Sequence, residues 1–247
     1  MKLAALLLFV SFGAHALTGG GYSTNPRYSA VVRIRTKFNQ ERSQQYCTGV
    51  FISPRHLLTA AHCLLSVENN DPRSAFTVDI SRFPSSDLFF DAISVDYPGA
   101  KFSIPEEYLK SPKATNPLDV GLITFARPIS KSFIPLSKAP ASEGSQILLT
   151  GYGCDRHERS WSTDFKLGSS KIAAAGSILK LQRSSVELCP GDSGGPALLE
   201  TKAGLRVAAV ASYINLFKGA FGLSKDRAID VGPGSQARKW IDSRLRN

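Results

Sequence analysis

Short apolar runs separated by turn residues make up most of the chain. The runs are rich in Val, Ile and Phe and are bounded by Gly, Pro, Asn or Ser, which is typical of β-strands. They cover residues 30–35, 50–52, 76–80, 120–125, 146–150 and 205–214. Apolar positions at helical spacing are almost absent before the C-terminus. Many short strands without intervening helices predict an all-β protein, built as a sandwich or a barrel.

The C-terminus and one polar stretch complete this outline. Four apolar side chains fall on one face at helical spacing, and Ser235 before them is a favoured N-cap residue. They are Ala237, Trp240, Ile241 and Leu245. Residues 135–145 are small and polar, and they divide the chain into near halves. We therefore expect two β domains joined at this linker and closed by a terminal α-helix.

The N-terminal segment has a different composition from the rest. Lys2 precedes an apolar run over residues 3–12, and Ala14-His15-Ala16 forms a small-x-small cleavage site. This order indicates a secretory signal peptide over residues 1–16 rather than a buried N-terminal helix. No later segment is long and apolar enough to be a membrane helix. We expect a secreted protein, extracellular or periplasmic, without stable membrane insertion.

The chain is basic, with a formal net charge of +10. Its basic residues are scattered, however. Arg33 and Arg35 alternate with apolar residues, as on the exposed face of a strand, and no basic stripe contains interleaved aromatic residues. This pattern favours a solvated cationic surface over a nucleic-acid-binding surface.

Four cysteines, in a chain with a signal peptide, are expected to form disulfides. They are Cys47, Cys63, Cys154 and Cys189, and their number alone allows three pairings. No two of them have the spacing of zinc ligands, which opposes a metal site. The sequence also contains no acidic loop that demands calcium and no sign of an organic cofactor. We therefore expect neither a metal nor a cofactor.

Three motifs follow one another in a meaningful order. They are TAAHC at residues 59–63, DVGLI at residues 119–123 and GDSGGP at residues 191–196. The resulting order of His62, Asp119 and Ser193 is that of the chymotrypsin type of hydrolase.

These three segments resemble the signature segments of the trypsin-like serine protease family. The likeness extends to GYG at residues 151–153, to ASY at 211–213 and to the terminal Trp240-Ile241, and it covers most of residues 17–247. The resemblance implies an all-β fold of two six-stranded antiparallel Greek-key β-barrels with a C-terminal α-helix. The first barrel would span residues 17–137, with His62 and Asp119. The second, with Ser193, would span residues 138–247.

The resemblance also implies a reaction, the hydrolysis of peptide bonds through an acyl-enzyme. Ser193 would attack the carbonyl carbon, His62 would act as base and then as acid, and Asp119 would orient the imidazole. The N–H groups of Gly191 and Ser193 would form the oxyanion hole. Ser212 would be a partner of Asp119. The expected state is a monomer, and the expected partners are a protein or peptide substrate and, as a further class, a protein inhibitor.

The same resemblance pairs Cys47 with Cys63, which leaves Cys154 to pair with Cys189. The pairing differs from the commonest pattern in vertebrate relatives, in which the cysteine before the GDSG segment bonds further downstream. No cysteine follows Cys189 here.

The start of the mature chain resembles that of the family as well. Leu17-Thr18-Gly19-Gly20 resembles an I-V-G-G start, whose free amine pairs with the residue equivalent to Asp192. Cleavage after Ala16 would expose Leu17, so we hypothesise that signal peptidase itself makes the active N-terminus. Leu and Thr depart from the usual β-branched pair. Cleavage after Ala14 would leave a two-residue pro-segment instead.

Two residues give conflicting indications of primary specificity. Glu187, six residues before Ser193, stands where trypsin-like relatives have an aspartate that binds Lys or Arg. Ile214, beside Ser212 in the same predicted pocket, replaces a wall glycine, and a branched side chain there favours small residues. We favour Lys or Arg before the scissile bond, because a buried unpaired carboxylate would be costly. A Glu187 side chain that points out of the pocket is the alternative.

Two other classes of function compete with a protease. The first is a catalytically silent binding or regulatory protein on the same fold, against which the intact triad, Gly191 and Asp192 argue. The second is a lipase or esterase, whose G-x-S-x-G pattern residues 191–195 match. The order of the triad and the lack of alternating strands and helices argue against that class.

Overall fold

The computed structural model describes most of the chain after the predicted signal peptide. The described residues are 17, 20–38, 44–65, 75–81, 92–95, 100–113, 115–155, 160–161, 164–182, 186–213 and 226–246. The predicted signal peptide over residues 1–16 and the pocket candidate Ile214 lie outside them. None of the helices in the described part of the chain has the length and apolar character needed to cross a membrane.

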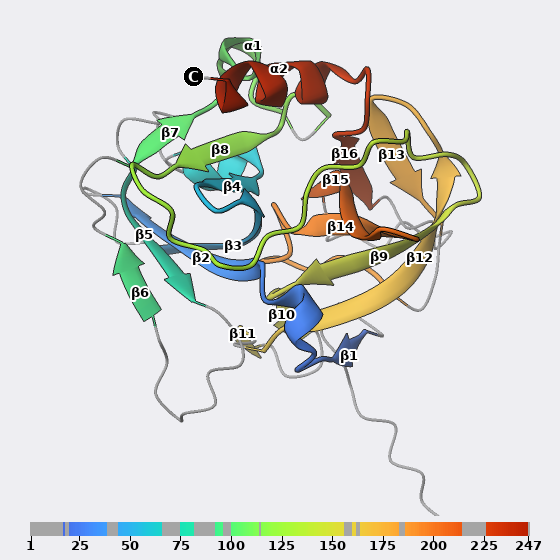
Figure 1. The fold of residues 1–247 in the computed structure, drawn as a ribbon, viewed down its shortest axis with the longest axis horizontal. Helices are drawn as coiled ribbons and strands as arrows, with labels where there is room; N and C mark the ends of the chain where they lie inside the picture. Colours follow the sequence, from blue (N-terminus) through green and yellow to red (C-terminus); the bar gives the residue numbers. More distant parts are fainter. Residues whose placement is uncertain are drawn as a thin grey trace, which may run out of the picture.

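The first half of the chain forms an antiparallel sheet. Its described strands occur in the order β6-β5-β2-β3-β4-β8-β7. They are β2 (Val31–Phe38), β3 (Gln44–Ser53), β4 (His56–Thr59), β5 (Ala75–Ser81), β6 (Ala92–Val95), β7 (Lys101–Ser103) and β8 (Gly121–Thr124). Three short helical turns accompany them, η1 (Pro26–Tyr28), η2 (Ala61–Leu64) and α1 (Glu106–Lys110). Figure 1 shows this sheet in blue to green on one side of the molecule.

The second half forms a closed barrel of six strands. They are β9 (Gln146–Gly151), β12 (Lys166–Ala174), β13 (Ile178–Leu181), β14 (Pro196–Thr201), β15 (Gly204–Tyr213) and β16 (Arg227–Asp230). The pairing of β12 with β9 closes the order β12-β13-β16-β15-β14-β9. The short β1 (Gly21–Tyr22), from the start of the chain, adds to this barrel beside β12. A small ribbon of β10 (Cys154–Asp155) and β11 (Ser160–Trp161) stands apart.

Strand periodicity explains how these sheets bury their apolar faces. In β2, Ile34 and Thr36 are fully buried while Arg33 and Arg35 are only partly buried, because successive side chains point to opposite faces. This is the alternation that the sequence predicted. Each fully buried Ile or Leu stabilises the fold by about 1.5–3 kcal/mol relative to an exposed one.

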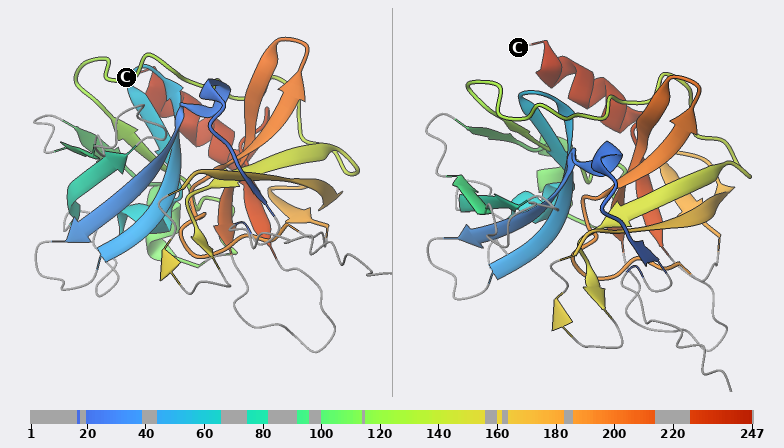
Figure 2. Two further views of the ribbon diagram at one scale, coloured as in Figure 1. Left: turned by 90° about the horizontal axis from the view of Figure 1, so that it is seen from below. Right: turned by 60° about the horizontal axis from the view of Figure 1, so that its bottom comes forward.

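The terminal helix connects the two halves. Helix α2 (Gln236–Leu245) begins after Ser235, whose hydroxyl accepts the Arg238 N–H at 3.0 Å. The predicted helix and its N-cap are therefore confirmed. Its buried residues Ala237 and Ile241 belong to a core cluster that also contains residues of the first sheet. The left view of Figure 2 shows the two sheets side by side with α2 behind them.

Candidate active site

The candidate base His62 lies on the short turn η2, directly after β4. Its ring Nδ1 is 2.8 Å from Oδ2 of Asp119, and its backbone N–H donates to Oδ1 of Asp119 at 3.0 Å. The His62 side chain is 29% exposed, whereas that of Asp119 is fully buried. The two contacts with one carboxylate fix both the position and the orientation of the imidazole, which still reaches solvent.

Two hydroxyl groups also hydrogen-bond to Asp119. Ser212, in β15, donates its hydroxyl to Oδ2 at 2.5 Å, as the sequence predicted for this pair. Tyr108, in α1, also hydrogen-bonds to the carboxylate through its side chain. Burial, together with the charge and hydrogen bond of Asp119, raises the pKa of Tyr108, so this phenol stays a donor. Sequence reasoning missed Tyr108, because a single tyrosine on a five-residue helix belongs to no motif.

The contact between His62 and Asp119 stabilises the protonated form of the imidazole and the ionised form of the carboxyl group. Burial opposes protonation of His62, but the charge and hydrogen bond of Asp119 outweigh it and raise the pKa of His62. Burial likewise opposes ionisation of Asp119. The charge of His62 and the hydrogen bonds from His62 and Ser212 overcome that effect and lower the pKa of Asp119. A buried carboxylate that stays ionised can stabilise the cation formed when His62 takes a proton.

The candidate nucleophile Ser193 lies in a tight loop between the two halves. Its carbonyl oxygen accepts the N–H of Thr48 at 2.8 Å and lies 3.6 Å from Sγ of Cys63, the residue after His62. The hydrogen bonds among the described residues do not include one from the Ser193 hydroxyl to His62. Such bonds are often long in ligand-free enzymes and shorten when substrate binds. The Ser193 backbone is thus anchored beside the turn that carries His62.

Thr48, in β3, makes several contacts that join the two halves. Its hydroxyl donates to the carbonyl of Gly191 at 2.8 Å and accepts the N–H of Tyr152 at 3.0 Å. Its carbonyl accepts the hydroxyl of Thr59 at 2.8 Å. With the Ser193 bond, one residue of the first sheet fixes the loop that carries the nucleophile.

The candidate oxyanion hole depends on glycines in this loop. Gly191 has φ of +99° and Gly194 has φ of +82°, conformations that favour glycine. A Cβ on Gly194 would also overlap Thr59 Oγ1 and the Thr48 carbonyl. Among the hydrogen bonds of the described residues, none uses the N–H of Gly191 or Ser193. These are the two N–H groups that the resemblance assigned to the oxyanion hole.

Asp192, between these donors, is fully buried. Its Oδ1 accepts the Gly153 N–H at 2.8 Å, and its Oδ2 accepts the Cys189 N–H at 2.8 Å. Burial raises the pKa of Asp192 to about 7, although these two bonds oppose the rise. The other predicted member of this site, Leu17, is fully buried in the core cluster of the second barrel. Its nitrogen is an amide in the uncleaved chain.

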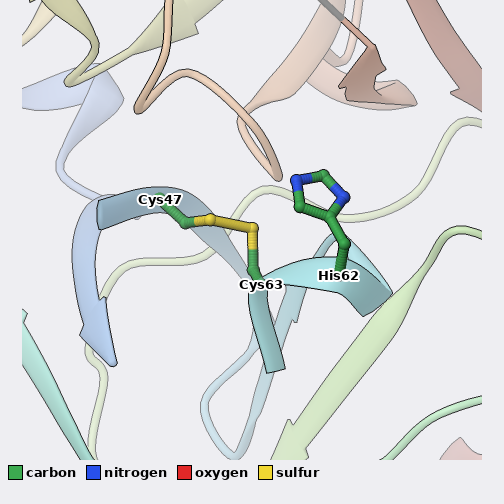
Figure 3. Close-up of side chains that lie close together, drawn as sticks. All are labelled: Cys47, His62 and Cys63. Atoms are coloured by element: carbon green, nitrogen blue, oxygen red, sulfur yellow. A yellow bond between two sulfur atoms is a disulfide. The ribbon is translucent and has the colours of Figure 1, made fainter. Parts of the chain in front are cut away.

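One disulfide stabilises the histidine side of the site. Cys47 in β3 is bonded to Cys63 in η2, as the resemblance implied. Figure 3 shows this disulfide beside the imidazole of His62. Possible metal-ligand atoms of Cys47, His62 and Cys63 lie within 4.8 Å of one another, but the two sulfurs are bonded to each other and are not thiolates. Cys189 is also disulfide-bonded. The Cys154 side chain lies outside the described residues, so its pairing with Cys189 stays a prediction.

The predicted specificity pocket is described in part. Glu187 is partly buried, Ser212 points to Asp119, and Ile214 lies outside the described residues. Sequence reasoning missed a second acidic residue that the fold brings to the chain segment of Glu187. Asp226 is buried, and its Oδ2 accepts the N–H of Leu188 at 2.9 Å, next to Glu187 in the chain. Its segment contains no motif, so only the fold reveals this proximity.

Comparisons with known proteins agree with the motifs. The sequence model of the family described as Trypsin matches residues 19–222. Phenoloxidase-activating factor 3 of Holotrichia diomphalia is 25% identical over 197 aligned positions, in a match that covers 64% of this chain and 52% of that protein. Phenoloxidase-activating enzyme 1 of Spodoptera litura is 23% identical over 216 aligned positions, in a match that covers 75% of this chain and 56% of that protein. The chain thus spans about half the length of the curated relatives that it matches.

A solved structure supports the fold independently of these sequences. A Glu endopeptidase, solved in complex with MPD, superposes with a TM-score of 0.68 at 15% identity. The match covers 93% of this chain and 97% of the other. It confirms the mostly-β, chymotrypsin-like architecture that the motifs implied.

Proposed function

Because the chain belongs to the trypsin family and carries a trypsin-like serine protease domain, we propose that it is a secreted serine endopeptidase. Ser193, His62 and Asp119 form its catalytic triad. The observation that carries this proposal is the use of both Asp119 oxygens to hold His62, beside the anchored loop of Ser193. Ion pairs between histidine and aspartate are common. Here, however, His62 and Asp119 each lie in a motif of the family, and the two motifs precede the Ser193 motif in the family's order.

The proposed reaction uses each of these groups in turn. Ser193 Oγ attacks the carbonyl carbon of the scissile bond and gives its proton to His62, while the N–H groups of Gly191 and Ser193 bind the oxyanion. The intermediate collapses to an acyl-enzyme when His62 protonates the leaving amine. Water, deprotonated by His62, then attacks the ester and releases Ser193. Asp119 remains ionised throughout and stabilises the imidazolium.

For specificity, we propose cleavage after Lys or Arg. Glu187 and Asp226 bring two carboxylates to adjoining segments of the second barrel, since Asp226 binds the N–H of the residue after Glu187. An anionic pocket attracts a cationic side chain and disfavours an acidic one. The named activity of the Glu endopeptidase is therefore not carried over to this chain. Protein substrates are proposed as well, since the relatives are named as activating factors and enzymes.

A cleavage map tests the triad and the specificity together. Purified protein is incubated with a complex peptide mixture, and new termini are identified by mass spectrometry. We expect cuts after Lys and Arg that disappear in Ser193→Ala and persist in the control Ser142→Ala, which changes an exposed serine. Ser193-dependent cuts after small residues would refute the specificity alone. No Ser193-dependent cut from folded protein that begins at Leu17 would favour the silent binding protein.

The N-terminus has its own test. We propose that signal peptidase cuts after Ala16, so that Leu17 begins the mature chain. Intact-mass measurement of the secreted protein should give a chain that starts at Leu17. A start at His15 would instead indicate a two-residue pro-segment and a second processing step.

A further inference from the structure

A buried lysine lies in the second barrel, outside the triad. Lys166, the first residue of β12, has no exposed surface. Full burial of a lysine is rare, because removing an ammonium group from water is costly unless another charge compensates it. Neither the motifs nor the proposed reaction uses this residue. Its surroundings therefore need an explanation of their own.

The strand register places Lys166 on the face where Asp192 lies. Lys166 pairs directly with Gly151 of β9, and directly opposed residues of an antiparallel pair point to the same face. A Cβ on Gly151 would overlap Oδ1 of Asp192, so this face of β9 is covered by the Asp192 carboxylate. The missing side chain of Gly151 leaves room for that carboxylate on the face that Gly151 shares with Lys166.

On its other side, Lys166 pairs with Tyr22 of β1. The Nζ atom lies 4.6 Å from the centroid of the Tyr22 ring, a distance at which a cation interacts favourably with an aromatic face. The aromatic face and the nearby carboxylate both favour the charged form of the lysine. The charge of Lys166 lowers the pKa of Asp192, while the charge of Asp226 raises it.

We propose that Lys166 is the built-in counter-charge of Asp192, and that it positions the oxyanion loop while the Leu17 nitrogen is still an amide. A newly freed Leu17 amine would act as a second cation in the mature chain. Lys166 is thus a positioning residue that acts through Asp192, and it lets the uncleaved chain form the oxyanion hole in part. The expected effect of Lys166 on catalysis rests on the proposed protease function. The expected charge pair between Lys166 and Asp192 does not.

The link from charge to loop geometry runs through two backbone bonds. Ionised Asp192 accepts the N–H of Gly153 with one oxygen and that of Cys189 with the other. A protonated carboxyl carries an O–H on one oxygen and is a weaker acceptor there. Losing the Cys189 bond would release the segment just before Gly191, whose N–H is one of the two proposed oxyanion donors.

A double-mutant cycle in stability tests the pair without using activity. In a Ser193→Ala background, which prevents self-cleavage, urea unfolding at pH 8 is compared for Lys166→Met, Asp192→Asn and the double variant. We expect Lys166→Met to lower the folding equilibrium constant at least tenfold more when Asp192 is present than when it is Asn. Lys171→Met, an exposed lysine on the same strand, is the matched control. Additive effects would overturn the proposal.

Activity measurements then separate positioning from a purely structural role. Two forms are compared, one beginning at Leu17 and one with residues kept before it. Lys166→Met should lower kcat of the extended form at least tenfold with little change in KM, and should raise the midpoint of its acidic pH limb. Lys166→Arg should restore most of the loss. Equal losses in both forms, or no rescue by arginine, would overturn the positioning role. If neither form shows Ser193-dependent activity, the protease function fails, and the stability cycle alone decides on the pair.

Discussion

The two fully buried aspartates, Asp119 and Asp192, differ in how their negative charge is balanced. Asp119 receives hydrogen bonds from His62, Ser212 and Tyr108, and its pKa is lowered. Asp192 receives two backbone N–H groups, and burial raises its pKa to about 7. The histidine half of the site is therefore electrostatically complete within the first sheet and its neighbours. At the oxyanion loop, the ionised form of Asp192 depends instead on a cation placed near it in the second barrel.

This contrast separates two ways of controlling a protease site. The relation between His62 and Asp119 needs no processing event, because every partner is already in the folded chain. The state of Asp192 responds to local cations, which can include a new amine at Leu17. Control of activity is therefore expected to act on the oxyanion loop rather than on the His62–Asp119 pair.

The largest expected effect comes from Asp119→Asn. An amide at this position can no longer stabilise the imidazolium, and it favours the wrong tautomer of His62. We expect kcat to fall by about 10³- to 10⁴-fold with a well-folded protein. The measurement is kcat on a peptide identified by the cleavage map, with circular dichroism as the check of folding. Asp242→Asn, on the surface of α2, is the matched control. A loss of less than tenfold would contradict the role given to Asp119.

A smaller effect is expected in the pH dependence of stability. The folded-state pKa of Asp192, about 7, lies above its ordinary value of 3.8, so the folded chain binds this proton more tightly than the unfolded chain. The Asp192 contribution should therefore lower the stability of the uncleaved chain as pH rises from about 4 to 7, by on the order of 4 kcal/mol at ~1.4 kcal/mol per pKa unit.

Denaturant unfolding at several pH values measures this contribution. Asp192→Asn should remove the decline, and a chain that begins at Leu17 should show less of it, because a free amine favours the ionised carboxylate. His62 has the same sign through its own raised pKa, since its contribution is complete below pH 6.5 and is lost as pH rises. Equal slopes in all three proteins would show that Asp192 is not the responsible group.

The smallest expected effect comes from Tyr108→Phe. The change removes one of several donors to Asp119 and leaves the ring that fills the core. A hydrogen bond to a charged group is worth about 1.5–3 kcal/mol, and water or the remaining donors recover part of it. We expect kcat to fall by about threefold to tenfold. The acidic limb of the pH profile should move to higher pH, because an Asp119 carboxylate with one donor fewer attracts the His62 proton more strongly. Tyr28→Phe, at a buried tyrosine that packs against Phe165, is the control. An unchanged pH profile would exclude Tyr108 from the site.

Much of the fold could be predicted because the apolar pattern follows the strands. Strand β9 and helix α2 match the segments that the sequence predicted, and Ser235 caps the helix as expected. Strand β12 escaped prediction, because its inward positions include Lys166 and Ser170, which break the apolar alternation. Strand β14 also escaped prediction. It begins at Pro196, the last residue of the GDSGGP motif, and sequence reasoning interpreted this segment only as a catalytic motif.

The site could be predicted where its chemistry lies in contiguous motifs, and not elsewhere. His62 and Asp119, which come from separate motifs, lie together, and the predicted contact of Ser212 with Asp119 is present. Tyr108, Lys166 and Asp226 escaped prediction, because each is a single polar residue that reaches the site only through folding. Composition cannot distinguish a buried lysine or aspartate from an exposed one.

The bonds of Thr48 have a consequence for how the molecule could be divided. This residue of β3 binds Ser193, Gly191 and Tyr152, all of which lie on the far side of the 135–145 linker. If the protein were split at that linker and expressed as two fragments, neither fragment would contain both Thr48 and the loop that it holds. The loop that carries Ser193 would then regain its position only when the two fragments associate. The rate of peptide cleavage would therefore measure how much of the fragments has assembled.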